Sequence, residues 1–523
     1  MKKTLRALLC AGLMAALMAI PALAADGEQP PAKQGDFYVV INGEYVTFPD
    51  AVPQIREGRS CLPFAAVFEQ LGFPQENMTW NADTQTVTAV KPDVVYEPST
   101  GGEAKQGDLT VELTIGSKEI RYWYENDLTA APHGDRVQVT NVLQSEVAPY
   151  ISGGRTYIPF GLLAKALGYN VGWDSTVGAV LIDDVNAILA ANTETYELMN
   201  QYQAYNRTFT QQNQQVTGKY AMDLSISEDA QGAANDITAT LNGDYSMVTS
   251  GATAFQFNTD MTVDADAKAN GVDVTAMLTS PDGTSLLPMK LGFDMRGDMA
   301  DGTFYFNLNS PQLTQLAGLD SAAWYKLDMA AVYDQMSALT GMNYKQLMEL
   351  SAASMEEDFA QLLPTILKSM PLTSVQFTAS DYLGLLNTIC GDSRFVKSGA
   401  NYVNTFLNEG GITGTFTIST NGNQVNGYAM EVKADPAVTG AEMTLSASMK
   451  GSKLEMAMNV AATAASSGVQ GGETISQAQI ELNLTMDGTY QATTQTPATQ
   501  PPAGATVVDL MELFGAVETP TAA

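Results

Sequence analysis

Side chains that commonly carry catalysis or bind metals are few in this chain of 523 residues. Histidine occurs once, as His133. Three kinds of centre need more histidines than the chain supplies. They are a copper site built on several imidazoles, a Ser–His–Asp relay with a local base, and an HExxH zinc helix. The composition therefore argues against these three kinds of centre.

Shorter motifs also fail to complete a site. Asp264-Ala-Asp266 begins like a calcium loop, but Lys268 and Ala269 replace the third ligand and the turn glycine. These residues instead predict a hairpin connection. Gly391-Asp392-Ser393 is similar to the start of an esterase motif, yet the sole histidine lies in a different predicted domain. We therefore expect no catalytic residues, no metal ligands and no cofactor, and a protein that is not an enzyme.

Composition narrows the remaining classes. There are 26 Lys and Arg residues against 57 Asp and Glu residues, a net charge of −31, so nucleic acid is not an expected partner. Only 16% of residues are charged and 45% are hydrophobic, which indicates folded domains rather than a disordered chain. The length predicts two to four folding units.

The first 24 residues have the pattern of a signal peptide. Lys2, Lys3 and Arg6 precede an apolar stretch at 7–20, and Ala22-Leu23-Ala24 forms a small-residue cleavage site. No later stretch approaches the ~18 apolar residues that span a bilayer. We expect a secreted or cell-surface-associated protein with no integral membrane span after cleavage. Cys61 and Cys390 then remain, and we expect both to be buried without a disulfide framework.

Composition divides the rest of the chain into four segments. These are a disordered leader (25–35), a repeat-containing region (36–186), alternating strands around a helical block (192–490), and a Thr/Pro linker with a short amphipathic tail (491–523). In the tail, Val507, Leu510, Met511 and Phe514 follow helical spacing. We expect this helix to be stable only when docked, either on its own sheet or on a surface partner, and we favour self-docking.

An internal repeat is the most specific feature. Arg59-Ser-Cys-Leu-Pro-Phe64 recurs as Arg155-Thr-Tyr-Ile-Pro-Phe160, and each copy continues with Leu-Gly and a tryptophan, Trp80 or Trp173. Proline opens a helix, the apolar residues that follow share one face, and Gly72 or Gly168 ends it. Two such small units are expected to share one core, with Arg59 and Arg155 equivalent and bonded to nearby carboxylates or carbonyls.

These paired motifs resemble the copper amine oxidase N-terminal-like domain, also called a stalk domain, of exported bacterial proteins. The resemblance implies a small antiparallel sheet wrapped on helices that serves as a surface module. It does not imply amine oxidation, because copper and the quinone cofactor of those enzymes belong to a separate catalytic domain. The quinone-precursor motif Thr-x-x-Asn-Tyr-Asp/Glu is approached at Thr340-Gly-Met-Asn343-Tyr344-Lys345, but Lys345 replaces its acidic residue.

Residues 215–310 and 412–487 alternate apolar and polar side chains with period two, which indicates about ten antiparallel strands covered on one face. Asn242-Gly243 and Asn421-Gly422 are among the predicted turns. Helices are expected at about 193–211 and within 329–408. The predicted fold class is α+β: the small stalk module, then a large curved antiparallel sheet with the helical block against its concave face. Its element order is similar to the half-barrel of lipoprotein carriers.

The inward strand face is rich in methionine, whose flexible thioether adapts to irregular apolar ligands. The predicted ligand face comprises Met222, Leu224, Phe255, Phe257, Phe293, Met295, Met430, Met443, Met456 and Met458. A solid Met-rich core is the alternative for the same residues. We expect a non-catalytic cell-envelope protein that binds or scaffolds at the surface, with a cell-surface component or an apolar ligand as partner. A carrier or sensor of lipids is the alternative function, and a hydrolase is the third.

Overall fold

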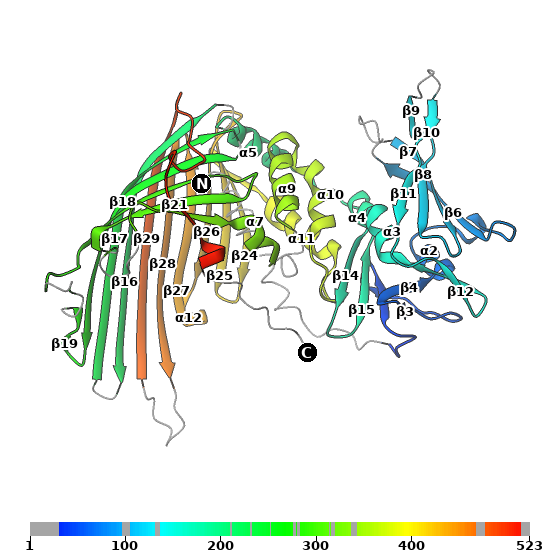
Figure 1. Ribbon diagram of the computed structural model, residues 1–523, viewed down its shortest axis with the longest axis horizontal. Coiled ribbons are helices and arrows are strands. Elements are labelled where there is room, and N and C mark those ends of the chain that lie inside the picture. Colours follow the sequence, from blue (N-terminus) through cyan, green and yellow to red (C-terminus); the bar gives the residue numbers. More distant parts are fainter. Residues whose placement is uncertain are drawn as a thin grey trace.

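The computed structural model of the chain has two parts, the repeat-containing N-terminal module and a large curled sheet, with helices between them (Figure 1). The structure describes residues 31–96, 105–130, 136–209, 212–230, 233–251, 253–275, 279, 283–312, 314, 320–335, 343–466 and 476–513. The predicted signal peptide, His133 and Phe514 lie outside these residues.

The two repeats form matching hairpins that join through their inner strands. The first hairpin is β3 (Gln54–Arg56) and β4 (Arg59–Pro63), and the second is β12 (Tyr150–Ser152) and β13 (Arg155–Pro159). Strands β4 and β13 pair antiparallel, so the sheet order is β12-β13-β4-β3. The order reads the same from either edge when the two repeats are exchanged.

A helix follows each hairpin, as the sequence predicts. Helix α2 (Phe64–Gln70) and helix α3 (Phe160–Ala166) begin directly after Pro63 and Pro159, which end their strands instead of entering the helix. Gly72 and Gly168 follow with φ of +82° and +85°. At this point the amide of Phe73 donates to Phe68 O and that of Tyr169 to Ala164 O, the pattern of a Schellman stop.

Both repeats contribute to one core. Phe64, Val67 and Phe68 of α2 are buried in the same cluster as Phe160 and Leu163 of α3. The rings of Phe68 and Phe160 lie 6.2 Å apart. The expectation that two small units share a core is therefore confirmed.

The rest of the module forms a four-stranded sheet, a five-stranded sheet and one short hairpin. Strand β1 lies parallel to β15, and β14 and β15 form the hairpin that carries Trp173. Strand β5, which carries Trp80, lies at the edge of a five-stranded sheet. The strands not bounded above are β1 (Tyr38–Ile41), β2 (Glu44–Tyr45), β5 (Met78–Asn81), β6 (Thr86–Tyr96), β7 (Lys105–Thr114), β8 (Glu119–Tyr124), β9 (Leu128–Ala130), β10 (Arg136–Gln138), β11 (Asn141–Gln144), β14 (Asn170–Asp174) and β15 (Ala179–Asp183).

The second part is a curled sheet of fifteen strands. Its order is β23-β24-β25-β26-β27-β28-β29-β16-β17-β18-β20-β21-β22-β30, with β19 paired to β18. The pairing is antiparallel except between β22 and β30. The strands are β16 (Gln214–Ala230), β17 (Ala233–Ser250), β18 (Ala254–Ala269), β19 (Val272–Asp273), β20 (Met289–Asp298), β21 (Thr303–Asn309), β22 (Trp324–Asp328), β23 (Val396–Ser398), β24 (Asn401–Glu409), β25 (Ile412–Asn421), β26 (Gln424–Ala434), β27 (Ala441–Lys450), β28 (Lys453–Ser466), β29 (Ser476–Ala492) and β30 (Val507–Asp509).

The curled α+β architecture is as predicted, but three local expectations are wrong. Residues 396–409 form β23 and β24 rather than helix, because they complete one edge of the sheet. Asn242-Gly243 lies inside β17 rather than in a turn. Asp264 and Asp266 lie inside β18, and the turn comes at Asn270-Gly271, where φ is +54° and +77°.

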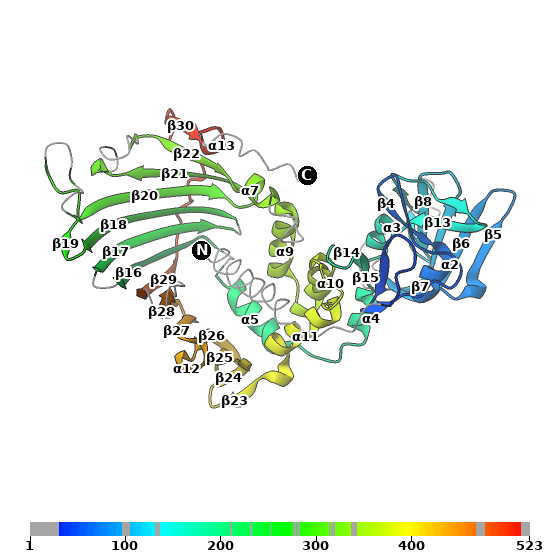
Figure 2. The same cartoon turned by 90° about the horizontal axis from the view of Figure 1, so that it is seen from below.

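Helices lie on the concave face of the sheet. Figure 2 shows α5 and α9 inside its curve and α10 toward the N-terminal module. Tyr202 of α5 contacts the rings of Phe416 and Tyr428 on the sheet. The helices of this part include α4 (Val185–Ala190), α5 (Glu197–Arg207), α7 (Met329–Gln335), α9 (Tyr344–Glu356), α10 (Phe359–Ser369), α11 (Ala379–Cys390) and α12 (Pro436–Thr439).

The N-terminal module is fixed to the helical block by side chains of the β14–β15 hairpin. Asn170 donates from Nδ2 to Leu367 O at 2.7 Å and to Met370 O at 2.8 Å. Asp174 accepts from the amide of Val375, and Asp183 accepts from that of Ala379 at 2.6 Å. Three of these four hydrogen bonds are buried, and each pairs a side chain of the module with a backbone group of the helical block, which makes this junction specific.

The C-terminal segment docks on its own sheet, but as a strand. After β29 the chain crosses the outer face, where the amide of Ala498 donates to Gln256 Oε1 and Arg296 donates to Gln500 O. Val507–Asp509 then pairs with β22 as β30, and only Leu510–Leu513 is helical, as α13. The predicted helix from Val507 onward is wrong because the free edge of β22 offers backbone partners.

Candidate apolar-ligand face

The inner face of the large sheet is the face on which the helices pack, and its side chains form continuous apolar rows across the strands. One row runs through directly paired residues from β27 to β18. Its members are Leu445, Met458, Leu484, Met222, Leu241 and Val263. The next rows contain Met443, Val460, Leu482 and Leu224, and then Ala462, Ile480, Ile226, Ile237 and Ala267. Since paired residues point to the same side, these rows are one surface.

All ten residues of the predicted ligand face lie on this inner face, but the helices cover some of them. Phe257, Met430 and Met456 pack against the core that the sheet shares with the helices. Phe255 is buried and contacts the ring of Phe304. Phe293 and Met295 lie on β20 beside Phe257. Met295 pairs directly with Phe257, and the ring of Phe293 is 6.2 Å from the ring of Phe257. The solid-core alternative therefore describes the proximal part of the face.

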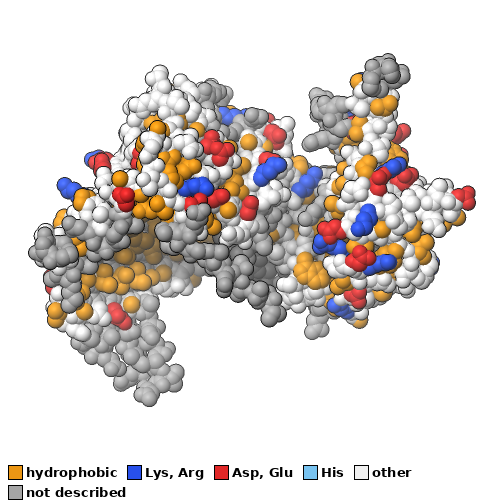
Figure 3. All heavy atoms as spheres, viewed as in Figure 1, with side chains coloured by type: hydrophobic (Ala, Val, Ile, Leu, Met, Phe, Trp, Pro, Cys, Tyr) orange, Lys and Arg blue, Asp and Glu red, His pale blue; other side chains and the backbone are white. Residues whose placement is uncertain are grey.

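Met222, Leu224, Met443 and Met458 lie farther along the strands, beyond the helix-packed cluster. We call this region the distal face. It comprises Met222, Leu224, Ile226, Ile237, Leu241, Val263, Met443, Leu445, Met458, Val460, Ile480, Leu482 and Leu484. Leu445 is 45% exposed, Ile237 44% and Ile480 37%. Figure 3 shows hydrophobic atoms lining the hollow of the curled sheet. Contiguous exposed apolar patches that are rimmed by polar residues often mark interaction surfaces.

In the curled sheet, two tyrosine side chains lie over glycines of neighbouring strands. The side chain of Tyr245 crosses Gly218 and Gly488, and its hydroxyl donates to Asp487 O at 2.8 Å. Tyr220 crosses Gly243 and bonds Thr259 Oγ1, also at 2.8 Å. Glycines inside strands permit sharp coiling, and a neighbouring aromatic ring covers the exposed backbone. Burial raises the pKa of Tyr245 to about 12, so this hydroxyl remains a donor at neutral pH.

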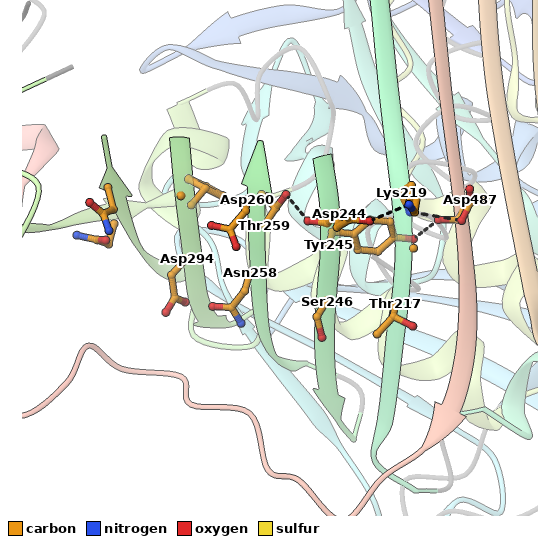
Figure 4. A pocket seen from close by; sticks show the side chains of 15 residues that line it. Thr217, Lys219, Asp244, Tyr245, Ser246, Asn258, Thr259, Asp260, Asp294 and Asp487 are labelled. Carbon is orange, nitrogen blue, oxygen red and sulfur yellow. Dashed lines mark hydrogen bonds and ion pairs between the residues drawn. The ribbon is translucent and has the colours of Figure 1, made fainter. Parts of the chain in front are cut away.

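The outer face is polar and acidic. A pocket of about 730 Å³ is lined mostly by outer-face side chains of β16–β20 and β29 (Figure 4). Asp244, Asp260, Asp294 and Asp487 are among them, and Lys219 lies 3.5 Å from Asp244. Within the described part of the chain, no three His, Cys, Asp or Glu side chains are placed to hold a metal ion. The two faces of the sheet thus differ sharply in chemistry, as strand alternation predicts.

The short motifs considered for chemistry have structural roles. Asn343 and Gln346 form a capping box at the start of α9, and the Tyr344 hydroxyl donates to Met299 O. Asp392 accepts the amides of Glu197 and Leu198 at 2.7 and 2.9 Å and so caps α5. Ser393 donates to Glu194 at 2.6 Å. Cys61 and Cys390 are buried, and neither forms a disulfide within the described part of the chain. Residues 340–342 lie outside the described residues.

Comparison with protein families identifies the N-terminal module. Residues 40–130 and 137–271 match the model of the copper amine oxidase N-terminal domain. The repeats resemble that domain. The match covers both repeats, as the sequence motifs predict, and its second segment continues through α5 and into the large sheet. The copper amine oxidase N-terminal domain is itself non-catalytic.

The residues present do not fit the copper and quinone centre of the enzymes after which this domain is named. A copper site of that kind takes imidazole ligands, and the chain holds one histidine. Tyr344, which occupies the tyrosine position of the incomplete quinone-precursor motif, is buried and donates to the backbone carbonyl of Met299. The match to this domain therefore does not extend to the copper and quinone centre.

Structural comparison gives only distant similarities. Lipovitellin, from a study of its lipid–protein interactions, has 10% identity and a TM-score of 0.21 over 55% of this chain, which spans about a quarter (26%) of the lipovitellin chain. Ail, the attachment invasion locus protein of Yersinia pestis, has 5% identity and a TM-score of 0.06, with coverage of 54% of this chain and 99% of Ail. Neither score establishes a shared fold. Comparison with curated proteins gives no match. Among the described residues, no helix is long and apolar enough to cross a membrane.

Proposed function

We propose that this protein binds the acyl chains of a lipid on the distal face, and that the copper amine oxidase N-terminal-like module holds the curled sheet at the cell surface as a stalk. The observation that carries the proposal is the open apolar hollow: Leu445, Ile237 and Ile480 stay 37–45% exposed beyond the helix-packed core. The protein acts as a binding module without catalysis.

The shape and chemistry of the distal face favour a flexible apolar ligand over a flat protein partner. The face is concave and built across strands of up to 18 residues, so a long chain can lie along it. Met222, Met443 and Met458 supply adaptable thioethers. Burying ten methylene groups there would contribute about 8 kcal/mol before the cost of ordering the ligand.

We also propose that the protein is exported from the cell. The basic residues, apolar stretch and small-residue site within 1–24 support secretion followed by surface association. N-terminal sequencing of the protein recovered outside its host cells should begin at Ala25. A mature chain that begins at Met1 would contradict export by this route.

Ligand binding is tested with a pyrene-labelled phosphatidylcholine and paired variants. Ile237→Gln with Leu445→Gln places amides on the distal face and should weaken binding about tenfold, equal to about 1.4 kcal/mol. Thr238→Gln with Thr444→Gln alters the next residue on the same strands, whose side chains point to the outer face, and should leave binding unchanged. Equal affinities of the two double variants would overturn the proposal.

Surface scaffolding through protein contacts is the second candidate. It is favoured by the packing of α5 and α11 on the proximal inner face, which provides a rigid platform. A protein that binds no lipid yet forms a dimer through the distal face, shown by sedimentation and lost in the Ile237→Gln and Leu445→Gln variant, would establish this candidate instead.

A further inference from the structure

We infer that the distal face selects amphiphiles whose headgroup carries no net negative charge, an inference that rests on the proposed lipid binding. The helices on the inner face determine the direction in which a bound lipid must face. Helices cover the proximal part of the inner face, where Phe257 and Met456 are packed. A polar headgroup therefore lies at the opposite end, where β16, β17 and β18 run beyond the apolar rows.

The inner face changes from apolar to polar side chains at this end. Ile226 and Ile237 pair directly across β16 and β17, and the next inner-face pair outward is Glu228 with Asn235. The amide of Asn235 donates to Glu228 Oε2 at 3.4 Å. A carboxylate and an amide thus stand where the apolar surface ends, in the position that a headgroup would occupy.

Carboxylates surround this end of the sheet. Six with described side chains are Glu228, Asp236, Asp264, Asp266, Asp273 and Glu481. Glu228 points to the inner face, whereas Asp236, Asp264, Asp266 and Glu481 point to the outer face behind the distal face. The basic side chain of the same strand ends is Lys268, which lies 4.0 Å from Asp266 and is half exposed. Neighbouring strands are about 4.8 Å apart, and the Debye length is about 30 Å in 0.01 M salt, so the fields of these charges add at low ionic strength.

Several basic side chains elsewhere on the sheet are paired with a carboxylate. Arg296 lies 2.6 Å from Asp294, and Lys326 lies 2.9 Å from Asp509. Lys433 lies 2.9 Å from Glu431. At the rim beside the distal face, Lys268 is one basic side chain among six carboxylates, so the local field is negative. It repels a phosphatidylglycerol headgroup and tolerates or attracts a headgroup with an ammonium, which is how repulsion produces selectivity.

The experiment compares pyrene-labelled phosphatidylcholine and phosphatidylglycerol with identical acyl chains. At low ionic strength we expect the zwitterionic lipid to bind at least tenfold more tightly. In 1 M salt, where the Debye length falls to about 3 Å, the difference should shrink to less than twofold. Equal affinities at low salt would overturn the selectivity while leaving lipid binding intact, whereas failure of both lipids to bind would refute the proposed function itself.

Substitutions locate the effect. Glu228→Gln with Asp236→Asn and Glu481→Gln should reduce the discrimination to threefold or less and leave phosphatidylcholine affinity within twofold. The control removes the same number of charges from the outer-face pocket, by Asp244→Asn, Asp260→Asn and Asp487→Asn, and should retain the discrimination. Equal loss in both triple variants would show that net charge, and not the rim, is responsible, and would overturn the inference.

Discussion

Leu62 and Ile158 lie opposite each other on β4 and β13, and each is the counterpart of the other in the two repeats. On either side, Cys61 pairs with Pro159 and Pro63 pairs with Tyr157, so exchange of the repeats reproduces the register. The Leu62–Ile158 pair therefore marks a pseudo-two-fold axis through the module. Both side chains are fully buried.

Truncation at this axis should destabilise the module strongly. Leu62→Ala or Ile158→Ala leaves a cavity in the shared core and should lower the free energy of unfolding by about 2–5 kcal/mol. The matched controls are Ile55→Ala and Ile151→Ala, which occupy equivalent exposed positions on β3 and β12. These should cost less than about 0.5 kcal/mol in urea unfolding followed by tryptophan fluorescence. Similar losses at all four positions would refute a shared core at the axis.

The same symmetry produces reciprocal ion pairs. Arg59 bonds Glu146 next to the second hairpin, and Arg155 bonds Asp50 next to the first, so the predicted carboxylate partners of both arginines are confirmed. All four side chains are more than half exposed. Arg59→Ala or Arg155→Ala should therefore cost less than about 1 kcal/mol, and the loss should shrink further in high salt. A loss above 2 kcal/mol would mean that these bridges, and not the core, join the repeats.

Gly172 permits the contact between the N-terminal module and the helical block. A Cβ atom there would lie 1.9 Å from Leu372 O, because the amide of Trp173 donates to that carbonyl. Gly172→Val should separate the strand from residues 371–378 and make that segment sensitive to limited proteolysis. Gly161→Ala in α3, where a Cβ meets nothing within 4 Å, should leave cleavage unchanged. Resistance of the Gly172→Val variant would contradict the role of this close approach.

Asp183 should make the junction sensitive to pH. Burial raises the pKa of this carboxyl above its usual value near 3.8, so folding favours its protonated form. The resulting stability is present below the unfolded-state pKa and is lost as pH rises through the higher folded-state value. Asp183→Asn keeps an acceptor for the Ala379 amide without the charge. It should be more stable than wild type at pH 7 and lose less stability than wild type between pH 4 and 7, as measured by urea unfolding. A lower stability at pH 7 would show that the carboxylate is required.

The C-terminal strand should protect the edge of β22. The amide of Trp324 donates to Thr506 O at 2.8 Å, and Lys326 pairs with Asp509. Truncation after Ala505 removes both partners and should speed hydrogen exchange at the Trp324 amide by at least tenfold. Val507→Ala changes a side chain that is 46% exposed and should preserve protection. Unchanged exchange after truncation would indicate that β30 is not docked in solution.

Local patterns in the sequence determined the repeats, their strand–helix order and the side of the sheet on which Met222, Met443 and Met458 lie. This succeeds because the period of a strand or helix and the φ requirement of Gly72 or Gly168 are properties of neighbouring residues. For the same reason the ten predicted face residues share one side of the sheet.

Tertiary structure alone decided how far the helices extend over that face, and so which of the ten residues remain open. It also placed Asn242-Gly243, which the sequence predicts as a turn, inside a strand, where Tyr220 from the adjacent strand covers Gly243. Likewise, Val507 joins a strand because Trp324, 183 residues earlier, presents a free edge. Such pairings depend on which backbone groups are left without partners after the rest of the sheet has formed, and no local period encodes that.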